Sequence, residues 1–164
     1  MHKSQRGFTL IELIIAIAIT GIIIGGIVMA IFQVISVNAL TANHLTAVRQ
    51  VQNAGHWITS DAKMAQNVVT ENLTAREVLR LTWTEWGSTK NQVITYTLVG
   101  EELWRSHSIG AVQHETLVAQ YISAISCQFA GGKLTLDVTA TVGGWQPATE
   151  TRTFRVVPRP RPRS

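Results

Sequence analysis

The most prominent feature of the chain is a long run of apolar residues near its amino terminus. Most residues in 8–37 are apolar or glycine, and none in 13–43 carries a charge. About 20 apolar residues of helix, at roughly 1.5 Å each, cross the hydrocarbon core of a bilayer. The pattern therefore predicts one membrane-spanning helix. It also places the lone carboxylate of Glu12 at one edge of the membrane, where an ionisable group indicates a function and needs a partner.

After this run the pattern becomes that of an amphipathic helix. Apolar residues recur at spacings of three, four or seven, at Leu45, Val48, Val51, Ile58, Ala62, Ala65 and Val69. Polar residues fall mostly on the remaining surface, at Arg49, Gln52, His56, Asp61 and Lys63. We therefore expect one helix from Phe8 to about Asn67. Gly55 is expected to soften it locally, because glycine costs about 1 kcal/mol in a helix interior.

Beyond the helix, alternating and β-branched runs predict strands. These runs cover residues 78–84, 92–98, 102–106, 126–129, 134–142 and 151–157. Turns are expected at Gly87-Ser88, Gly100-Glu101 and Gly131-Gly132. In 134–142 the apolar residues alternate with threonine and aspartate, as in a strand with one buried face. Residues 115–123 are ambiguous, and we interpret them as a short connection with one buried face.

These elements predict an α+β fold in which a long amino-terminal helix packs on an antiparallel β-sheet. A helix and a sheet that each have one apolar face bury those faces against each other. Four regions follow: a leader of residues 1–7, the transmembrane half of the helix over 8–37, a globular domain over 38–157, and a tail over 158–164. The tail alternates proline and arginine, which favours an extended conformation without packed structure.

The formal net charge of +4 is concentrated at the two ends of the chain. Lys3 and Arg6 precede the apolar run, five arginines lie within 152–163, and the part between contains more acidic than basic residues. A basic body that would bind nucleic acid is therefore not expected. The positive-inside rule keeps the leader in the cytoplasm and the rest outside. The tail is interpreted as solvated, with an acidic partner as the alternative.

The residues that lead into the apolar helix form a signal. A short basic leader ends at Gly7, Phe8 follows, and Glu12 is the fifth residue after the glycine. This segment, Gly7-Phe8-Thr9-Leu10-Ile11-Glu12-Leu13, resembles the class III signal of type IV pilins and pseudopilins. The resemblance implies that a prepilin peptidase cuts between Gly7 and Phe8 and methylates the new amino group of Phe8. The alternative is an uncleaved signal anchor with Glu12 at the membrane interface.

The same resemblance implies a role for Glu12 in assembly. Its carboxylate would meet the positive amino terminus of a neighbouring subunit, and opposite charges attract strongly in a low dielectric. Gly21 and Gly25 have the four-residue spacing that lets membrane helices approach closely, although simple flexibility is the other interpretation. The expected partners are therefore the peptidase and other pilins or pseudopilins in the inner membrane.

The globular part resembles the J-type minor pseudopilin of type II secretion systems. The positions that carry this resemblance are Tyr96, Leu98, Leu103, Arg105, Leu117, Val118, Ile125, Phe129, Thr153 and Phe154. Many major pilins close a carboxy-terminal loop with a disulfide, which the lone Cys127 cannot form, so the chain resembles a pseudopilin or minor subunit more than a major pilin.

Catalytic and metal-binding patterns are not found in the sequence. The histidines, His2, His44, His56, His107 and His114, lack the spacing that places metal ligands on one helical face. There is no nucleophile motif and no glycine-rich phosphate loop. Cys127 is interpreted as a small buried residue, and the tryptophans mostly as core. No enzyme activity, metal or cofactor is therefore expected.

The sequence thus predicts a structural subunit, a minor pseudopilin or minor pilin that crosses the inner membrane once with its amino terminus in the cytoplasm. It would be assembled into a type II secretion pseudopilus or a type IV pilus and would support protein secretion. The alternative is a minor pilin that acts as a binding module in DNA uptake, adhesion or motility.

Overall fold

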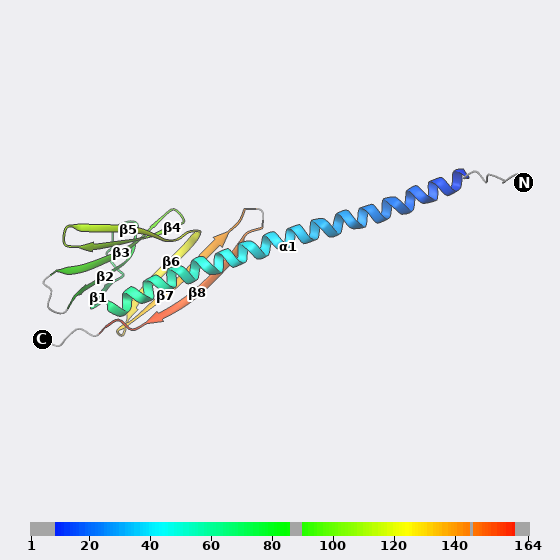
Figure 1. The fold of residues 1–164 in the computed structure, drawn as a ribbon. Coiled ribbons are helices and arrows are strands. Elements are labelled where there is room, and N and C mark those ends of the chain that lie inside the picture. Colours follow the sequence, from blue (N-terminus) through cyan, green and yellow to red (C-terminus); the bar gives the residue numbers. More distant parts are fainter. Residues whose placement is uncertain (1–8, 86–89, 145, 160–164) are drawn as a thin grey trace, which may run out of the picture. The chain divides into compact units, whose positions relative to one another are not determined.

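The computed structural model describes residues 9–85, 90–144 and 146–159. In this part of the chain a long helix precedes the strands (Figure 1). The elements are α1 (Leu10–Met64), β1 (Asn67–Val69), β2 (Glu77–Thr84), β3 (Asn91–Val99), β4 (Glu102–Ile109), β5 (Val112–Ala119), β6 (Ile122–Ala130), β7 (Lys133–Val142) and β8 (Ala148–Val156). The expected leader, the Gly87-Ser88 turn and most of the tail lie outside the described residues.

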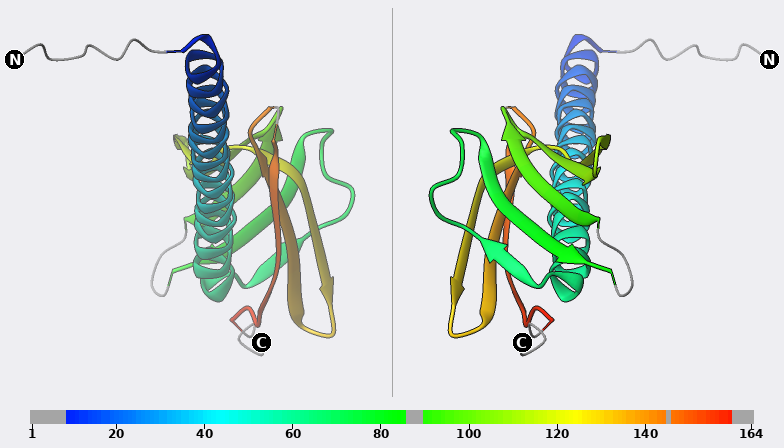
Figure 2. Two further views of the ribbon diagram at one scale, coloured as in Figure 1. Left: turned by 90° about the vertical axis from the view of Figure 1, so that its right-hand side faces the viewer. Right: turned by 90° about the vertical axis from the view of Figure 1, so that its left-hand side faces the viewer.

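The chain divides into two units between Thr41 and Ala42. The first unit contains the amino-terminal part of α1. The second contains the rest of α1 and all the strands. In the second unit the cyan-to-green end of α1 lies against the strands in both views of Figure 2.

Within the second unit α1 has one buried face. That face is formed by Ala47, Val51, Ala54, Gly55, Ile58, Asp61 and Ala62. The amphipathic pattern is confirmed for Val51, Ile58 and Ala62, which are fully buried. The expectation for Leu45 is wrong, since its side chain is 52% exposed. A helix turns by about 100° per residue, so Leu45 lies on the side opposite the buried Ala47.

All the strand pairs are antiparallel, which confirms the α+β fold of one long helix on antiparallel strands. The strands divide into two sheets, one with the order β1-β2-β3-β4-β5 and one with the order β6-β7-β8. The division falls at Tyr121, whose φ of 60° turns the chain out of β5. The first residue of β6, Ile122, then donates a backbone hydrogen bond to the carbonyl of Glu101 over 2.9 Å.

Residues 115–123 are not the short connection that the sequence indicated. They contain the end of β5 and the beginning of β6. β5 is an edge strand whose residues are exposed from Val112 to Leu117 on both faces. A strand exposed in this way has no reason to alternate between apolar and polar residues, so the period-two signal is missing.

The helix also ends earlier than the sequence indicated, at Met64 instead of about Asn67. The backbone N–H of Gln66 donates to the carbonyl of Thr82 over 3.0 Å, so it does not continue the helical ladder. The side-chain amide of Gln66 bonds to both the N–H and the carbonyl of Thr84, over 3.2 and 3.3 Å. Hydrogen bonds to β2 therefore replace the last helical turn, and β1 follows.

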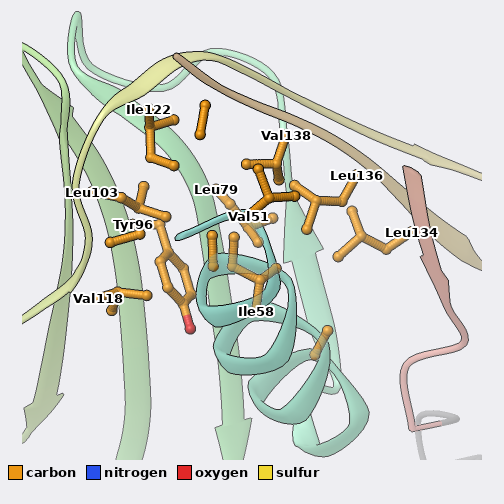
Figure 3. Packing of buried hydrophobic residues seen from close by; sticks show 14 of the residues in the cluster. Val51, Ile58, Leu79, Tyr96, Leu103, Val118, Ile122, Leu134, Leu136 and Val138 are labelled. Carbon is orange, nitrogen blue, oxygen red and sulfur yellow. The ribbon is translucent and has the colours of Figure 1, made fainter. Parts of the chain in front are cut away.

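The core of the second unit lies between α1 and the inner faces of both sheets (Figure 3). β7 contributes Leu134, Leu136, Val138 and Ala140, all fully buried, which confirms the alternation expected for this strand. The predicted turn at Gly131-Gly132 is also confirmed, because both glycines have positive φ and connect β6 to β7.

Gly55 is a position of close contact. α1 continues through it without interruption, and a Cβ there would overlap the ring of Phe154 on β8. Glycine therefore lets an aromatic ring of the sheet reach the backbone of the helix. Gly55 thus meets a packing requirement, and the softening of α1 expected there stays a prediction.

Asp61 corrects the sequence prediction most clearly. The helical pattern places it on the exposed surface, but its side chain is only 4% exposed. The Tyr96 hydroxyl donates a hydrogen bond to its Oδ2 over 2.5 Å. Arg105 donates from Nε to Oδ2 over 2.7 Å and from Nη2 to Oδ1 over 3.1 Å. Both carboxylate oxygens are thus satisfied, as a buried charge requires.

This cluster of Asp61, Tyr96 and Arg105 connects α1 to β3 and β4. Burial and then the charge of Asp61 raise the pKa of Tyr96, so its phenol stays protonated and donates. Burial lowers the pKa of Arg105, but the hydrogen bond and charge of Asp61 outweigh it, and the net shift is upward. The guanidinium also lies over the ring of Trp57, 5.3 Å from its centroid.

We predict that Asp61→Asn lowers the free energy of unfolding by about 3–5 kcal/mol, because it leaves the buried Arg105 charge without its partner. Urea unfolding of the full-length protein in detergent, followed by tryptophan fluorescence, measures the change. Glu150→Gln is the matched control, since it breaks the more exposed pair with Arg152 and is expected to cost less than about 1 kcal/mol. Equal costs for the two variants would contradict the structural role of Asp61.

We also predict that Gly55→Ala is destabilising by about 1–3 kcal/mol, because the added methyl group meets the Phe154 ring. In an uncrowded helix the same change would stabilise by about 1 kcal/mol, so the sign of the effect is diagnostic. The same unfolding experiment in a Phe154→Leu background should show a smaller cost for the alanine. Stabilisation by Gly55→Ala in the wild-type background would rule out the contact.

Candidate assembly site

The first turn of α1 is closed by hydrogen bonds between Thr9 and Glu12. The Thr9 backbone N–H and hydroxyl both donate to Oε2 of Glu12, over 3.1 and 3.0 Å. In return, the Glu12 backbone N–H donates to the Thr9 hydroxyl over 3.4 Å. This is a capping box, in which threonine at the N-cap and glutamate three residues later satisfy each other's backbone donors.

The capping box has the sequence pattern Thr9-x-x-Glu12. The assembly role expected for Glu12 did not take these local hydrogen bonds into account. Glu12 therefore has a partner within its own chain. Both of its bonds go to one oxygen, Oε2, and a carboxylate has about four lone-pair sites. Since these bonds lie at an exposed position, the rest of the carboxylate is free to accept a donor from another molecule.

The apolar part of α1 that follows is not covered by other residues in 9–85, 90–144 or 146–159. Its large side chains are exposed, with exposed fractions of 77% at Leu10, 76% at Ile22 and 77% at Met29. Residues 10–37 of the helix extend over about 42 Å, more than the hydrocarbon thickness of a bilayer. By length and composition this helix is able to cross a membrane. An apolar surface of this size requires lipid or protein around it.

Two hydroxyl side chains along this surface form hydrogen bonds within the helix. The hydroxyl of Thr20 donates to the carbonyl of Ala16 over 2.7 Å, and that of Ser36 donates to the carbonyl of Phe32 over 2.9 Å. Such bonds to the preceding turn need no partner in lipid. Within residues 9–43, Glu12 is the one ionisable side chain.

Gly21 and Gly25 lie on an open surface of the helix. A Cβ added at either position would meet no atom within 4 Å, so no other side chain among the described residues occupies the space beside them. The two glycines are one turn apart on one face, and at about 100° per residue Gly21 is roughly 180° from Glu12. The acid and the glycines thus belong to opposite faces of α1. Of the remaining site residues, Gly7 and Phe8 lie outside the described residues.

Outside the membrane-spanning segment, Cys127 is half-buried and packs against the core. Burial and then the nearby Asp137 raise the pKa of its thiol to about 12. The thiol is therefore protonated at neutral pH and is a poor nucleophile, in agreement with the sequence interpretation. Trp57 departs from the expected core role, because it is 40% exposed on α1.

Comparison with known families identifies the amino-terminal segment. Residues 2–28 match the family described as the prokaryotic N-terminal methylation motif. No curated protein and no solved structure matches the chain. The matched region includes Gly7, Phe8 and Glu12 and continues into the exposed apolar part of α1. The chain therefore carries a prokaryotic N-terminal methylation motif that continues into a helix long and apolar enough to cross a membrane.

Proposed function

We propose that this protein is a minor structural subunit of a pilus or pseudopilus. Prepilin peptidase would cut after Gly7 and methylate Phe8, and the apolar part of α1 would then enter a fibre of similar helices. The observation that carries the proposal is the continuity of the methylation motif with an apolar helix surface that its own chain leaves uncovered. Neighbouring helices in a fibre would replace lipid around that surface.

The proposed role of Glu12 is to attract the amino terminus of the adjoining subunit. A charged acid at the edge of a membrane is favoured by a counter-charge, and the two bonds from Thr9 supply none. A positive amine on the neighbouring chain would supply the missing counter-charge. The pairing would also fix how far one subunit is shifted along the next, since it joins two defined atoms.

The opposite placement of Glu12 and the glycines supports contacts with two different neighbours. Gly21 and Gly25 would accept one adjoining helix at close range, while Glu12 would face another. A subunit with a contact on each side is able to extend a fibre, because each addition leaves a new face open.

The proposed location is the inner membrane, with the leader in the cytoplasm and the folded unit outside. The basic residues Lys3 and Arg6 ahead of the helix support this orientation. The finer assignment, to a type II secretion pseudopilus, rests on the resemblance of residues 96–154 to J-type minor pseudopilins and stays a prediction. The folded unit is assigned a structural role without catalysis.

We predict that protein extracted from its native membrane begins at Phe8 and carries a methyl group on its amino terminus. Intact-mass measurement and amino-terminal sequencing test this directly. A chain that begins at Met1 would contradict processing, and the assembly proposal would fall with it.

We predict further that Glu12→Gln is cleaved normally but enters fibres at least about tenfold less than wild type, the loss expected for about 1.4 kcal/mol of pairing energy. Glutamine is accepted in a capping box, so this change keeps the helix start and removes only the charge. Fibres sheared from cells and quantified by immunoblot against the membrane fraction provide the measurement.

Thr9→Val is the matched control for Glu12→Gln. It removes the hydroxyl that bonds to Glu12 but keeps the acid, so we expect near wild-type incorporation. The reverse pattern, with Glu12→Gln incorporated and Thr9→Val excluded, would show that capping is the whole role of Glu12.

A further inference from the structure

The hairpin of β4 and β5 brings two histidines together. Ile109 pairs with Val112 across a two-residue turn of Gly110 and Ala111, and Gly110 has the positive φ of 61° that such turns require. Counting back from this turn places His107 directly opposite His114. Directly opposed residues of an antiparallel pair lie on the same face, with Cβ atoms about 4.5–5.5 Å apart.

The next two strands of the sheet support His107 from its other side. The ring of Trp83 on β2 stacks with the imidazole, with 6.1 Å between the ring centroids and 22° between the planes. The side chain of Gln92 on β3, which is 6% exposed, contacts it with Oε1 2.8 Å from Nε2 of His107. The imidazole is thus held in place by two neighbouring side chains.

The contact with Gln92 determines which ring nitrogen of His107 is available. An amide oxygen only accepts hydrogen bonds, so Nε2 carries the proton and donates to it. Nδ1 is left with a free lone pair in the neutral ring. A histidine that donates its other N–H to a carbonyl oxygen is the usual arrangement of a metal ligand.

Arg105 lies two residues before His107 on β4. Arg105 would repel a cation, but its guanidinium is paired with Asp61 at 2.7 Å. His114 is exposed at the surface, so an ion has access from solvent.

From this geometry we propose that His107 and His114 form a binding site for a divalent transition metal, with Cu²⁺ bound more tightly than Zn²⁺. Imidazole nitrogens suit both ions, and affinities for such ligands rise to a maximum at Cu²⁺. Metal–nitrogen distances of about 2.0–2.1 Å are within reach of two rings on directly opposed residues. Among the described residues no set of three histidine, cysteine or acidic side chains is grouped for a metal, so water would complete the coordination.

The experiment is a titration of the full-length mature protein, without an affinity tag and in detergent, with Cu²⁺. Because Trp83 stacks on His107, we expect bound Cu²⁺ to quench its fluorescence in a saturable manner. The quenched fraction should disappear in Trp83→Phe. Zn²⁺ should compete for the site and restore the emission, since it binds the same nitrogens without quenching.

The informative variant is His114→Gln, because this exposed side chain has no part in the core and its loss should leave the fold intact. We expect the apparent Cu²⁺ affinity to fall at least about tenfold. Mutation of a residue that only supports a metal ligand already lowers metal affinity by about that factor, and loss of a ligand should cost no less. His44→Gln and His56→Gln on exposed positions of α1 are matched controls and should bind Cu²⁺ as wild type does. If the leader is retained, every variant is made in a His2→Gln background.

Saturable quenching that is lost in His114→Gln and kept in both controls would establish the site. Quenching that is linear in Cu²⁺, equal in His114→Gln and wild type, or lost equally in a control would overturn it. Circular dichroism of each variant shows whether its fold is intact.

Discussion

A buried carboxylate must have partners, and in this protein that constraint fixes how α1 lies on the sheet. Asp61 accepts hydrogen bonds from Tyr96 and Arg105, which come from two adjacent strands. Because these bonds have definite directions, they define the rotation of α1 about its axis more sharply than apolar contacts do. The same rotation turns Gly55 towards Phe154 and buries Val51 and Ile58. Packing of the second unit therefore depends on one polar cluster.

The two acids of α1 face the same physical problem in different surroundings. Asp61 lies in a protein core and has all its partners within the chain. Glu12 begins an apolar helix, and the partner that the structure records for it is Thr9. Under the proposed function, this partly satisfied acid would attract a positive group of a neighbouring subunit. Asp61 thus serves folding, whereas the proposed role of Glu12 lies in assembly.

The hairpin of β4 and β5 shows how a tight turn determines which side chains meet. His107 and His114 are seven residues apart, a spacing that would place them two turns, or about 10 Å, apart along a helix. Across the turn at Gly110 and Ala111 the same spacing makes them direct neighbours. Residues 112–119 lack the alternation of a half-buried strand, so the pairing and the histidine pair were both missed. The sequence signal for both was Gly110, because glycine is typical of two-residue hairpin turns.

The sequence by itself determined the features that depend on neighbouring residues. These include the apolar helix, the signal around Gly7 and Phe8, the capping pair of Thr9 and Glu12, and the alternating strand from Leu134 to Val142. Only the tertiary structure decided that Asp61 is buried, that α1 stops at Met64 and that the strands divide at Tyr121. Each of these depends on hydrogen-bond partners that are distant in the chain, such as Arg105 for Asp61 and Thr82 for Gln66. Local periodicity contains no information about such partners, and a polar residue in a helix is therefore placed correctly only once its distant partner is known.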